Sequence, residues 1–335
     1  MVGINNFKNV VMKKIFALLI LSVALVSCYK DYIKDFDYTG VYFTYPFDVR
    51  TLVVGEGMNI EIGVALSGVM KNSMDRDVSF SIEDTLITPE ILTAMKGGAN
   101  YIKNAVSSVT TLLPLPTNYY TLSDYNIILI KSGQHSGSIL LKADSTNFLA
   151  DNATIDATYA LPLYITSADA DTILESNRYS VIGVKYENML FGNYWHGGVT
   201  IIKDIGDNTI QTIKYYTSIP TPENTIWTLK TVAPNVLVTN GFSNNTSTQG
   251  EMRLTLDGSN ITVSSNAGST FTIMPDGTST FNQAKLLQNR KIILSYKYVN
   301  LDGNTCYAQD TLTFRNRIRD GVNEWLDENP SHYLK

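Results

Sequence analysis

Histidine and cysteine, which supply many nucleophiles and metal ligands, are sparse in this chain of 335 residues. It holds three histidines, at positions 135, 196 and 332, and two cysteines, Cys28 and Cys306. A metal site needs several such ligands at short spacing, and neither His-Glu-x-x-His nor Cys-x-x-Cys occurs. The Gly-x-Ser-x-Gly elbow, the phosphate-binding loop and the dinucleotide fingerprint do not occur either. We therefore expect no metal, no cofactor and no enzyme activity.

Glycoside hydrolysis is the reaction hardest to exclude, because it needs only two carboxylates roughly 5–9.5 Å apart. Asp169 and Asp171 are candidates, but their segment offers no aromatic side chain that would raise one pKa. A solvated turn explains them better, and the repeating oxygen ligands of a calcium loop are missing. A glycoside hydrolase is therefore the least favoured alternative.

Aromatic residues could instead form a sugar-binding platform. The apolar face of a sugar stacks on an exposed ring, while amides and carboxylates bind its hydroxyl groups. The candidate platform residues are Tyr194, Trp195, Tyr215, Tyr216 and Trp227, with Asn193, Glu223 and Asn224 as polar neighbours. The alternative is that these rings fill or border the core of a β domain, as such residues usually do.

Two features near the C-terminus have both a binding and a structural interpretation. Arg315, Arg317 and Arg319 alternate, so on a strand they would line one face. That face could bind a carboxylate or phosphate, or pair with acidic neighbours in solvent. Residues 321–328 predict a short helix, stopped at Pro330, and we expect Trp325 to pack it onto the preceding domain.

Residues 13–28 follow the pattern of a bacterial lipoprotein signal. Two lysines precede a 12-residue apolar run, which ends in Leu-Val-Ser before Cys28. The run is too short to cross a hydrocarbon core of about 30 Å as a helix. A buried helix and an ordinary secretory signal are the alternatives. We expect residues 1–27, starting at Met1 or Met12, to be removed and Cys28 to be acylated and to hold the protein on a membrane.

The mature chain would carry a net negative charge. Loss of residues 1–27 leaves 23 of the 26 basic residues against 31 acidic ones. Such a surface argues against nucleic acid as a partner and against binding to anionic lipid through a basic patch. With Cys28 acylated, Cys306 is the only free thiol, so no internal disulfide can form.

The mature chain predicts a tether at 28–38 and two β domains. From 39 to 187, short alternating runs are separated by turn residues, as in an antiparallel sandwich. Pro89 to Val109 is the exception and predicts one or two short helices, broken at Gly97-Gly98. From 188 to 335, Asp-Gly pairs at 257, 276 and 302 predict hairpins of a meander that closes into an antiparallel barrel.

Several segments are similar to a known family. Residues 115–123, 130–137 and 161–165 resemble the N-terminal immunoglobulin-like domain, of unknown function, in surface lipoproteins of Bacteroidota. Residues 184–188 and 310–321 resemble its usual C-terminal partner, a calycin-like (lipocalin-like) barrel. The resemblance covers most of residues 30–335. It implies an all-β fold, with an immunoglobulin-like β-sandwich followed by the barrel, and a link to polysaccharide-uptake systems.

The resemblance also bears on location and modification. The family's usual export signal after the cysteine is acidic, whereas here Lys30 and Lys34 are interleaved with aspartates. We expect an outer-membrane anchor with display at the cell surface, and a periplasm-facing anchor stays open. Four Asp-Ser/Thr motifs resemble the O-glycosylation acceptor pattern of exported Bacteroidota proteins, and Thr85, Ser145 and Thr172 are the candidate acceptors.

These observations together predict a non-catalytic, lipid-anchored lipoprotein that binds a glycan or glycoconjugate at the cell surface in support of polysaccharide uptake. The alternative from a different class is a structural or adhesive surface module that binds a protein partner. An aromatic-lined cleft would favour the first function, and an exposed apolar patch without such a cleft would favour the second.

Overall fold

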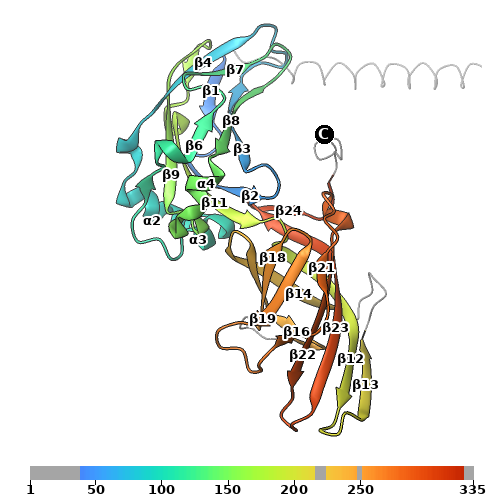
Figure 1. Ribbon diagram of the computed structural model, residues 1–335. Coiled ribbons are helices and arrows are strands. Elements are labelled where there is room, and N and C mark those ends of the chain that lie inside the picture. The colour runs from blue at the N-terminus through green and yellow to red at the C-terminus, as the bar shows by residue number, and fades with distance from the viewer. Residues whose placement is uncertain (1–37, 216–223, 247–250, 328–335) are drawn as a thin grey trace, which may run out of the picture.

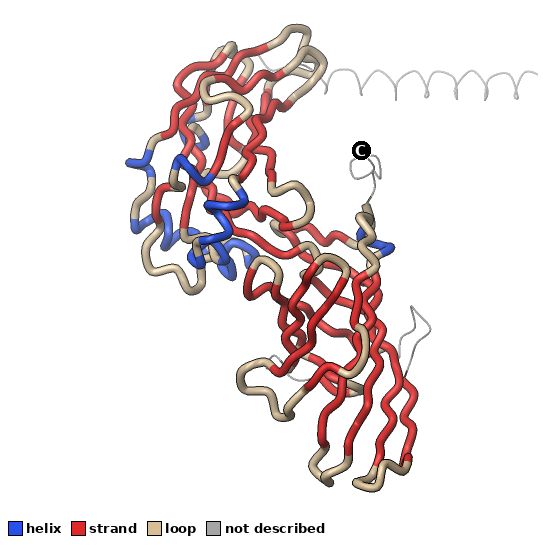
Figure 2. The backbone as a smooth tube through the Cα atoms, in the orientation of Figure 1, coloured by secondary structure: helices blue, strands red, loops and turns tan. Residues whose placement is uncertain are grey.

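The computed structural model describes residues 38–215, 224–246 and 251–327. They form two lobes, which Figure 1 shows stacked end to end. Strands up to residue 188 build the first, the sandwich lobe, and strands from residue 192 onward build the second, the barrel lobe. The predicted all-β fold, a sandwich followed by a barrel-like domain, is confirmed (Figure 2). Cys28, Tyr216 and Glu223 lie outside the described residues.

Two sheets face each other in the sandwich lobe. The first sheet has the strand order β10 (Thr172–Ile173), β1 (Gly40–Phe43), β3 (Asn59–Ser67), β8 (Ser136–Ala143) and β6 (Tyr120–Leu122). The second sheet has the order β2 (Phe47–Val54), β11 (Tyr179–Asn188), β9 (Tyr159–Ala168), β4 (Arg76–Ile82) and β7 (Ile127–Ile130), and β5 (Leu113–Pro114) pairs with β9. The chain therefore changes sheet between β1 and β2.

Alternating side chains explain why these segments form the sandwich. Along β3, Ile60, Ile62 and Val64 are buried, while Asn59 and Glu61 are exposed. Successive side chains of a strand point to opposite faces, so the isoleucines and valine enter the space between the sheets. Buried apolar residues from β1, β4, β8 and β9 fill the same core.

Short helices interrupt the strands where the sequence predicts them. α2 (Pro89–Gly97) begins after Thr88, whose hydroxyl accepts a hydrogen bond from the backbone N–H of Ile91. α3 (Asn100–Ala105) follows the break at Gly97-Gly98, and both helices pack on the second sheet. A further helix, α4 (Ser145–Ala150), is capped by Asp144 and was not predicted. Within the described part of the chain, every helix is too short or too polar to cross a membrane.

One long sheet closes on itself in the barrel lobe. The ring consists of β12 (Gly192–Lys203), β14 (Thr225–Ala233), β15 (Val236–Thr239), β18 (Met252–Asp257), β19 (Asn260–Ser265), β21 (Ser279–Phe281), β22 (Lys291–Val299) and β23 (Thr305–Arg319). Pairing of β12 with β23 closes the ring. The other described strands of this lobe lie outside the ring: β13 (Thr209–Tyr215), β16 (Gly241–Phe242), β17 (Asn245–Thr246), β20 (Met274–Pro275) and β24 (Val322–Glu324).

Two of the three predicted Asp-Gly hairpins are present. β18 turns into β19 at Asp257-Gly258, and the turn from β22 to β23 contains Asp302-Gly303. The predicted hairpin at Asp276-Gly277 is wrong. The strands on either side of it, β20 and β21, do not pair with each other, because both pair with the same long strand β22.

The predicted C-terminal helix is also wrong. β23 turns at Asp320-Gly321 into the antiparallel strand β24, and the two turn residues have φ angles of 51° and 81°, as a type I′ hairpin requires. Trp325 is 62% exposed, so it does not pack the tail onto the barrel. Asp327 makes that contact instead, because its carboxylate accepts a hydrogen bond from the backbone N–H of Leu287.

Buried ion pairs hold the junction between the lobes. The turn between β2 and β3 carries Glu56, whose carboxylate accepts hydrogen bonds from Arg290 at 2.6 Å and from Arg317 at 2.8 and 2.9 Å. Arg317 also pairs with Glu324. The side chains of Arg290, Arg317 and Glu56 are 0%, 1% and 5% exposed. We call Glu56, Arg290, Arg317 and Glu324 the ion cluster.

Candidate binding groove

The aromatic residues predicted to bind sugar do not form a surface platform. Tyr194 and Trp227 have no exposed area. The Trp227 indole stacks on the His196 ring at 4.0 Å, with the planes 11° apart, and the Tyr194 hydroxyl donates to the carbonyl of Leu190. The prediction that Tyr194 and Trp227 are platform residues is wrong, because both lie in the barrel core.

Trp195 and Tyr215 are half-buried and already have partners. The guanidinium of Arg315 lies 5.0 Å from the centre of the Trp195 ring, so it occupies one face of the indole. The Tyr215 hydroxyl donates to Asp310 at 2.7 Å and lies 3.0 Å from the Thr200 hydroxyl. Tyr215 stacks on the His196 ring, as Trp227 does, so these two lie in one cluster inside the barrel. Trp195 instead lies beneath Arg315, and the described candidates therefore share no exposed platform.

Tyr215 is part of a polar network inside the barrel. Fully buried Asp310 accepts hydrogen bonds from Tyr215 and Tyr296, and its carboxylate lies 3.0 Å from Nε2 of His196. Burial, together with the Asp310 carboxylate, raises the pKa of both tyrosines, so they remain protonated donors. A buried carboxylate needs such donors, and the network is therefore part of the packing of the barrel.

A β-bulge separates the three alternating arginines. β12 pairs Asn193 with Asn316 and Tyr194 with Phe314, so Arg315 is the extra residue of β23. Arg315 faces Trp195, while Arg317 turns inward to the ion cluster and Arg319 pairs with Glu324. The prediction of one shared face is wrong. Pairing with acidic neighbours is confirmed for Arg317 and Arg319, but the expected exposure to solvent is wrong for Arg317, whose side chain is 1% exposed.

The remaining candidate residues occupy turns and surface positions. Asp171 accepts hydrogen bonds from the backbone and hydroxyl of Thr39, and Asp169 accepts one from the backbone of Asp77, so each carboxylate links two segments that are distant in the sequence. Thr85 and Ser145 are exposed, and Thr172 is partly buried in β10. Among the residues that the structure describes, His, Cys, Asp and Glu form no cluster suited to a metal ion. Burial raises the pKa of the Cys306 thiol.

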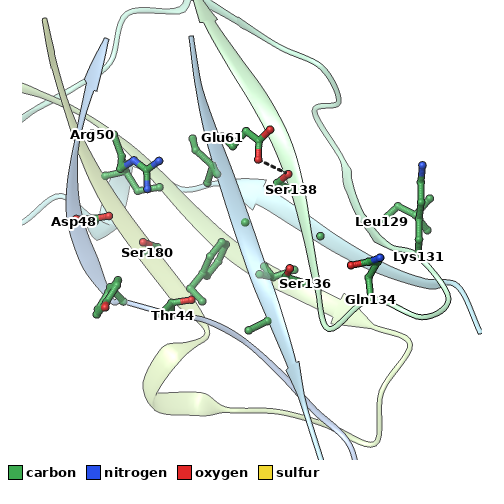
Figure 3. Close-up of a pocket in the computed structure, with 18 residues that line it drawn as sticks. Thr44, Asp48, Arg50, Glu61, Leu129, Lys131, Gln134, Ser136, Ser138 and Ser180 are labelled. Atoms are coloured by element: carbon green, nitrogen blue, oxygen red, sulfur yellow. Dashed lines mark hydrogen bonds between the residues drawn. The ribbon is translucent and has the colours of Figure 1, made fainter. Parts of the chain in front are cut away.

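A hollow of about 630 Å³ lies in the sandwich lobe, far from the predicted platform. We call it the first hollow. Figure 3 shows Asp48 and Arg50 of β2 on one side, and Glu61 of β3 with Ser136 and Ser138 of β8 on the other. The Ser138 hydroxyl donates to the Glu61 carboxylate at 3.3 Å. Pockets of roughly 300–1,000 Å³ are typical of small-molecule sites.

The change of sheet after β1 opens this hollow. β1 pairs with β3 only as far as Phe43 opposite Val64, and the chain then crosses to begin β2 at Phe47. The first half of β3 therefore pairs with β8 on one side and has no strand on the other among the described residues. The crossing segment carries Tyr45, which is 58% exposed and lines the hollow.

Charged and polar groups line the same hollow as Tyr45. Asp48 and Arg50 lie on one side of β2, since they alternate with Val49. Burial raises the pKa of the Asp48 carboxyl, although hydrogen bonds from the Tyr101 hydroxyl and the backbone N–H of Val49 oppose this effect. Nε of Arg50 lies 3.5 Å from Oδ2 of Asp320, which is too far for a hydrogen bond. This buried nitrogen therefore has no hydrogen-bond partner in the described structure.

Sequence reasoning missed the first hollow because its lining comes from separated parts of the chain. Thr44 to Arg50, Glu61 to Ala65 and Lys131 to Ser138 contribute most of it. None of these segments carries a motif. One local signal existed: Tyr45-Pro46 falls between two alternating runs, so an exposed ring at a strand crossing was foreseeable.

Comparisons with known proteins agree with this architecture. A family model described as a "-like, N-terminal domain" matches residues 30–172. A search of the curated proteins finds no match. A Bacteroides ovatus structure of unknown function is similar at 20% identity and a TM-score of 0.60, covering 87% of this chain and 99% of that one. The shared fold therefore extends over both lobes.

Two further structures are more distant. One is a multidomain Bacteroides ovatus protein that includes a domain of unknown function, at 12% identity, a TM-score of 0.42, and coverage of 86% of this chain and 100% of that one. The other is described as an auxiliary nutrient binding protein of Bacteroides thetaiotaomicron, at 14% identity, a TM-score of 0.39, and coverage of 84% and 96%. The chain is thus similar to Bacteroides proteins whose functions are largely unknown.

Proposed function

We propose that this protein is an exported, lipid-anchored lipoprotein that binds a glycan in the first hollow and supports polysaccharide uptake without catalysis. The observation that carries the proposal is the exposed Tyr45 ring beside Arg50, Asp48 and Glu61 in one hollow. The lipoprotein pattern at Cys28 supports the anchor, which we propose lies in the outer membrane and faces outward.

The lining of the first hollow favours an uncharged, polyhydroxylated ligand. Carboxylates and a guanidinium can each bind two sugar hydroxyl groups, and Ser136, Ser138 and Gln134 add further polar contacts. The basic side chains, Arg50 and Lys131, are balanced by Asp48 and Glu61, so an ionic ligand gains no net attraction. Tyr45 offers the apolar face that distinguishes a sugar from water.

A binding screen with one matched pair of variants tests the proposal. Affinity gels containing host and plant polysaccharides should show retarded migration of the wild-type protein. Tyr45→Ala should weaken binding about tenfold, because losing one aromatic contact costs on the order of 1–1.5 kcal/mol. Tyr38→Ala is the control, since Tyr38 is 60% exposed but does not line the first hollow. Failure to bind any polysaccharide, or equal effects of both variants, would contradict the proposal.

The anchor needs its own test. Cys28→Ala should move the protein from the membrane fraction to the soluble fraction of the expressing cells, because it removes the only residue that can be acylated in this pattern. Protease added to intact cells should degrade the wild-type protein if it faces outward. Membrane retention of Cys28→Ala would refute the lipid anchor.

A glycoside hydrolase is a second candidate, on one observation. Asp48 and Glu61 both line the first hollow, and burial raises the pKa of Asp48 in the direction that a general acid requires. We favour binding because Oδ1 of Asp48 already accepts hydrogen bonds from Tyr101 and Val49. New reducing ends in a bound polysaccharide, abolished by Asp48→Asn, would support hydrolysis instead.

A further inference from the structure

A second hollow lies between the two lobes. It has a volume of about 800 Å³ and is lined on the sandwich side by the turn between β2 and β3 and by the start of β3. On the barrel side it is lined by Lys285, Arg319, Asp320 and Val322. Arg50 and Glu61 line both hollows, so the two meet at these side chains.

β3 forms a common wall for both hollows. Asn59, Ile60 and Glu61 line the second hollow, and Glu61 to Ala65 line the first. At about 3.4 Å per residue, this stretch of strand is roughly 20 Å long. That length exceeds a single sugar ring several times, so a compact ligand would leave much of the wall uncovered.

We propose that the two hollows form one continuous groove that binds an extended, uncharged oligosaccharide across both lobes. This inference rests on the proposed glycan-binding function and specifies its substrate class. Arg50 and Glu61 lie at the middle of the groove, Tyr45 contacts the sugar units in the first hollow, and Lys285 contacts those in the second.

Contacts between the lobes hold the two halves of this groove in register. The ion cluster joins the turn between β2 and β3 to the barrel. The Asp320 carboxylate accepts a hydrogen bond from the Thr51 hydroxyl at 2.7 Å, and Gly321 packs closely on the Tyr101 ring. Because these contacts fix the two lobes before the ligand binds, less conformational entropy is lost on binding. A long ligand can therefore contact both lobes at once.

The charges of the second hollow also favour an uncharged chain. Arg290 pairs with Glu56 and Arg319 with Glu324, while Nε of Arg50 lies 3.5 Å from the Asp320 carboxylate without a hydrogen bond. Lys285 is exposed, and its ammonium has no ion-pair partner in the described part of the chain. Lys285 is therefore free to donate hydrogen bonds to sugar hydroxyl groups, while the paired residues shape the wall.

Isothermal titration with a length series tests the groove. The probes are linear manno-, xylo- and malto-oligosaccharides of one to six units. For the series that binds, affinity should rise at least about tenfold from two units to six. Tyr45→Ala should weaken binding of both lengths, whereas Lys285→Ala should weaken only the six-unit ligand, by about threefold or more. Lys291→Ala is the control, because Lys291 is exposed on β22 but lines neither hollow.

The outcomes separate this inference from the proposed function. Equal affinity for two and six units, or full six-unit affinity in Lys285→Ala, would overturn the continuous groove while leaving glycan binding in place. No binding of any oligosaccharide and none of any polysaccharide would overturn both.

Discussion

Replacing Glu56 by glutamine should destabilise the junction between the lobes. The substitution keeps the shape of the side chain but removes the negative charge that Arg290 and Arg317 share. Arg317 retains Glu324 as a partner, whereas Arg290 is left with carbonyl oxygens, those of Ala284, Lys285 and Met189. The main cost is therefore one buried guanidinium without a counter-charge.

The size of this effect follows from the burial of the cluster. Breaking a buried ion pair by removing one partner typically costs about 3–5 kcal/mol. We expect the lower end, about 3 kcal/mol, because the carbonyl oxygens still accept hydrogen bonds from Arg290. For a lobe of this size, each kcal/mol lowers the Tm by roughly 2–4 °C. The predicted decrease is therefore about 6–12 °C.

Differential scanning calorimetry at pH 7 measures this decrease, with Glu175→Gln as the control. Glu175 also pairs with an arginine, Arg178, but its side chain is 76% exposed. Exposed pairs contribute about 0–1 kcal/mol, so the control should change the Tm by no more than a few degrees. Equal decreases for the two variants would refute the conclusion that the ion cluster stabilises the junction.

A change of pH and two further substitutions should each change the stability of the protein for a different physical reason. Burial alone would raise the pKa of Glu56, but the hydrogen bonds and charges of Arg317 and Arg290 outweigh it and hold the pKa below its ordinary value. The stabilisation from the Glu56 carboxylate is therefore present above the pKa that Glu56 has in the unfolded chain. It is lost as the pH falls through the lower pKa that Glu56 has in the folded protein, so the Tm difference between wild type and Glu56→Gln should shrink between pH 7 and pH 3. Tyr296→Phe removes the hydroxyl that bridges the backbone N–H of Ser243 and Asp310. Urea unfolding should show a loss of about 1–3 kcal/mol, and a loss near zero would mean that the network has no stabilising role. Gly241→Ala places a methyl group inside the Trp227 indole and should prevent normal packing of the barrel, whereas Gly97→Ala, with open space around it, should leave the Tm unchanged or slightly higher. Comparable destabilisation by both alanines in thermal scans would contradict the packing described for Trp227.

Local patterns in the sequence were sufficient for most of the fold. Alternation identified strands such as β3, the Pro89 start and the glycine break identified α2 and α3, and Asp-Gly pairs identified two hairpins. Asp320-Gly321 is the same signal, and it forms the turn into β24 where the sequence predicts a helix over 321–328. The hairpin predicted at Asp276-Gly277 is wrong for another reason. The strands on either side of this pair, β20 and β21, both pair with β22, and local sequence does not show that β22 is their partner.

The candidate site could not be predicted in the same way. Tyr194 and Trp195 are adjacent on β12, so one must face inward, but period-two alternation does not say which. A one-residue bulge at Arg315 then moved Arg317 from the outer face to the ion cluster. The groove itself depends on where β1 stops pairing with β3 and on how the lobes meet, and both are properties of the tertiary structure.

Hydrogen–deuterium exchange tests the position of the ligand most directly. The wild-type protein would be compared with and without the polysaccharide that retards it most strongly in affinity gels. The structure predicts slower exchange in Glu61–Gly63 of β3 and in the adjacent segment Lys131–Ser138. Both segments line the first hollow, and β1 does not pair with this part of β3. Slower exchange confined to the barrel around Trp195, with no change along β3, would contradict the assignment of glycan binding to the sandwich lobe.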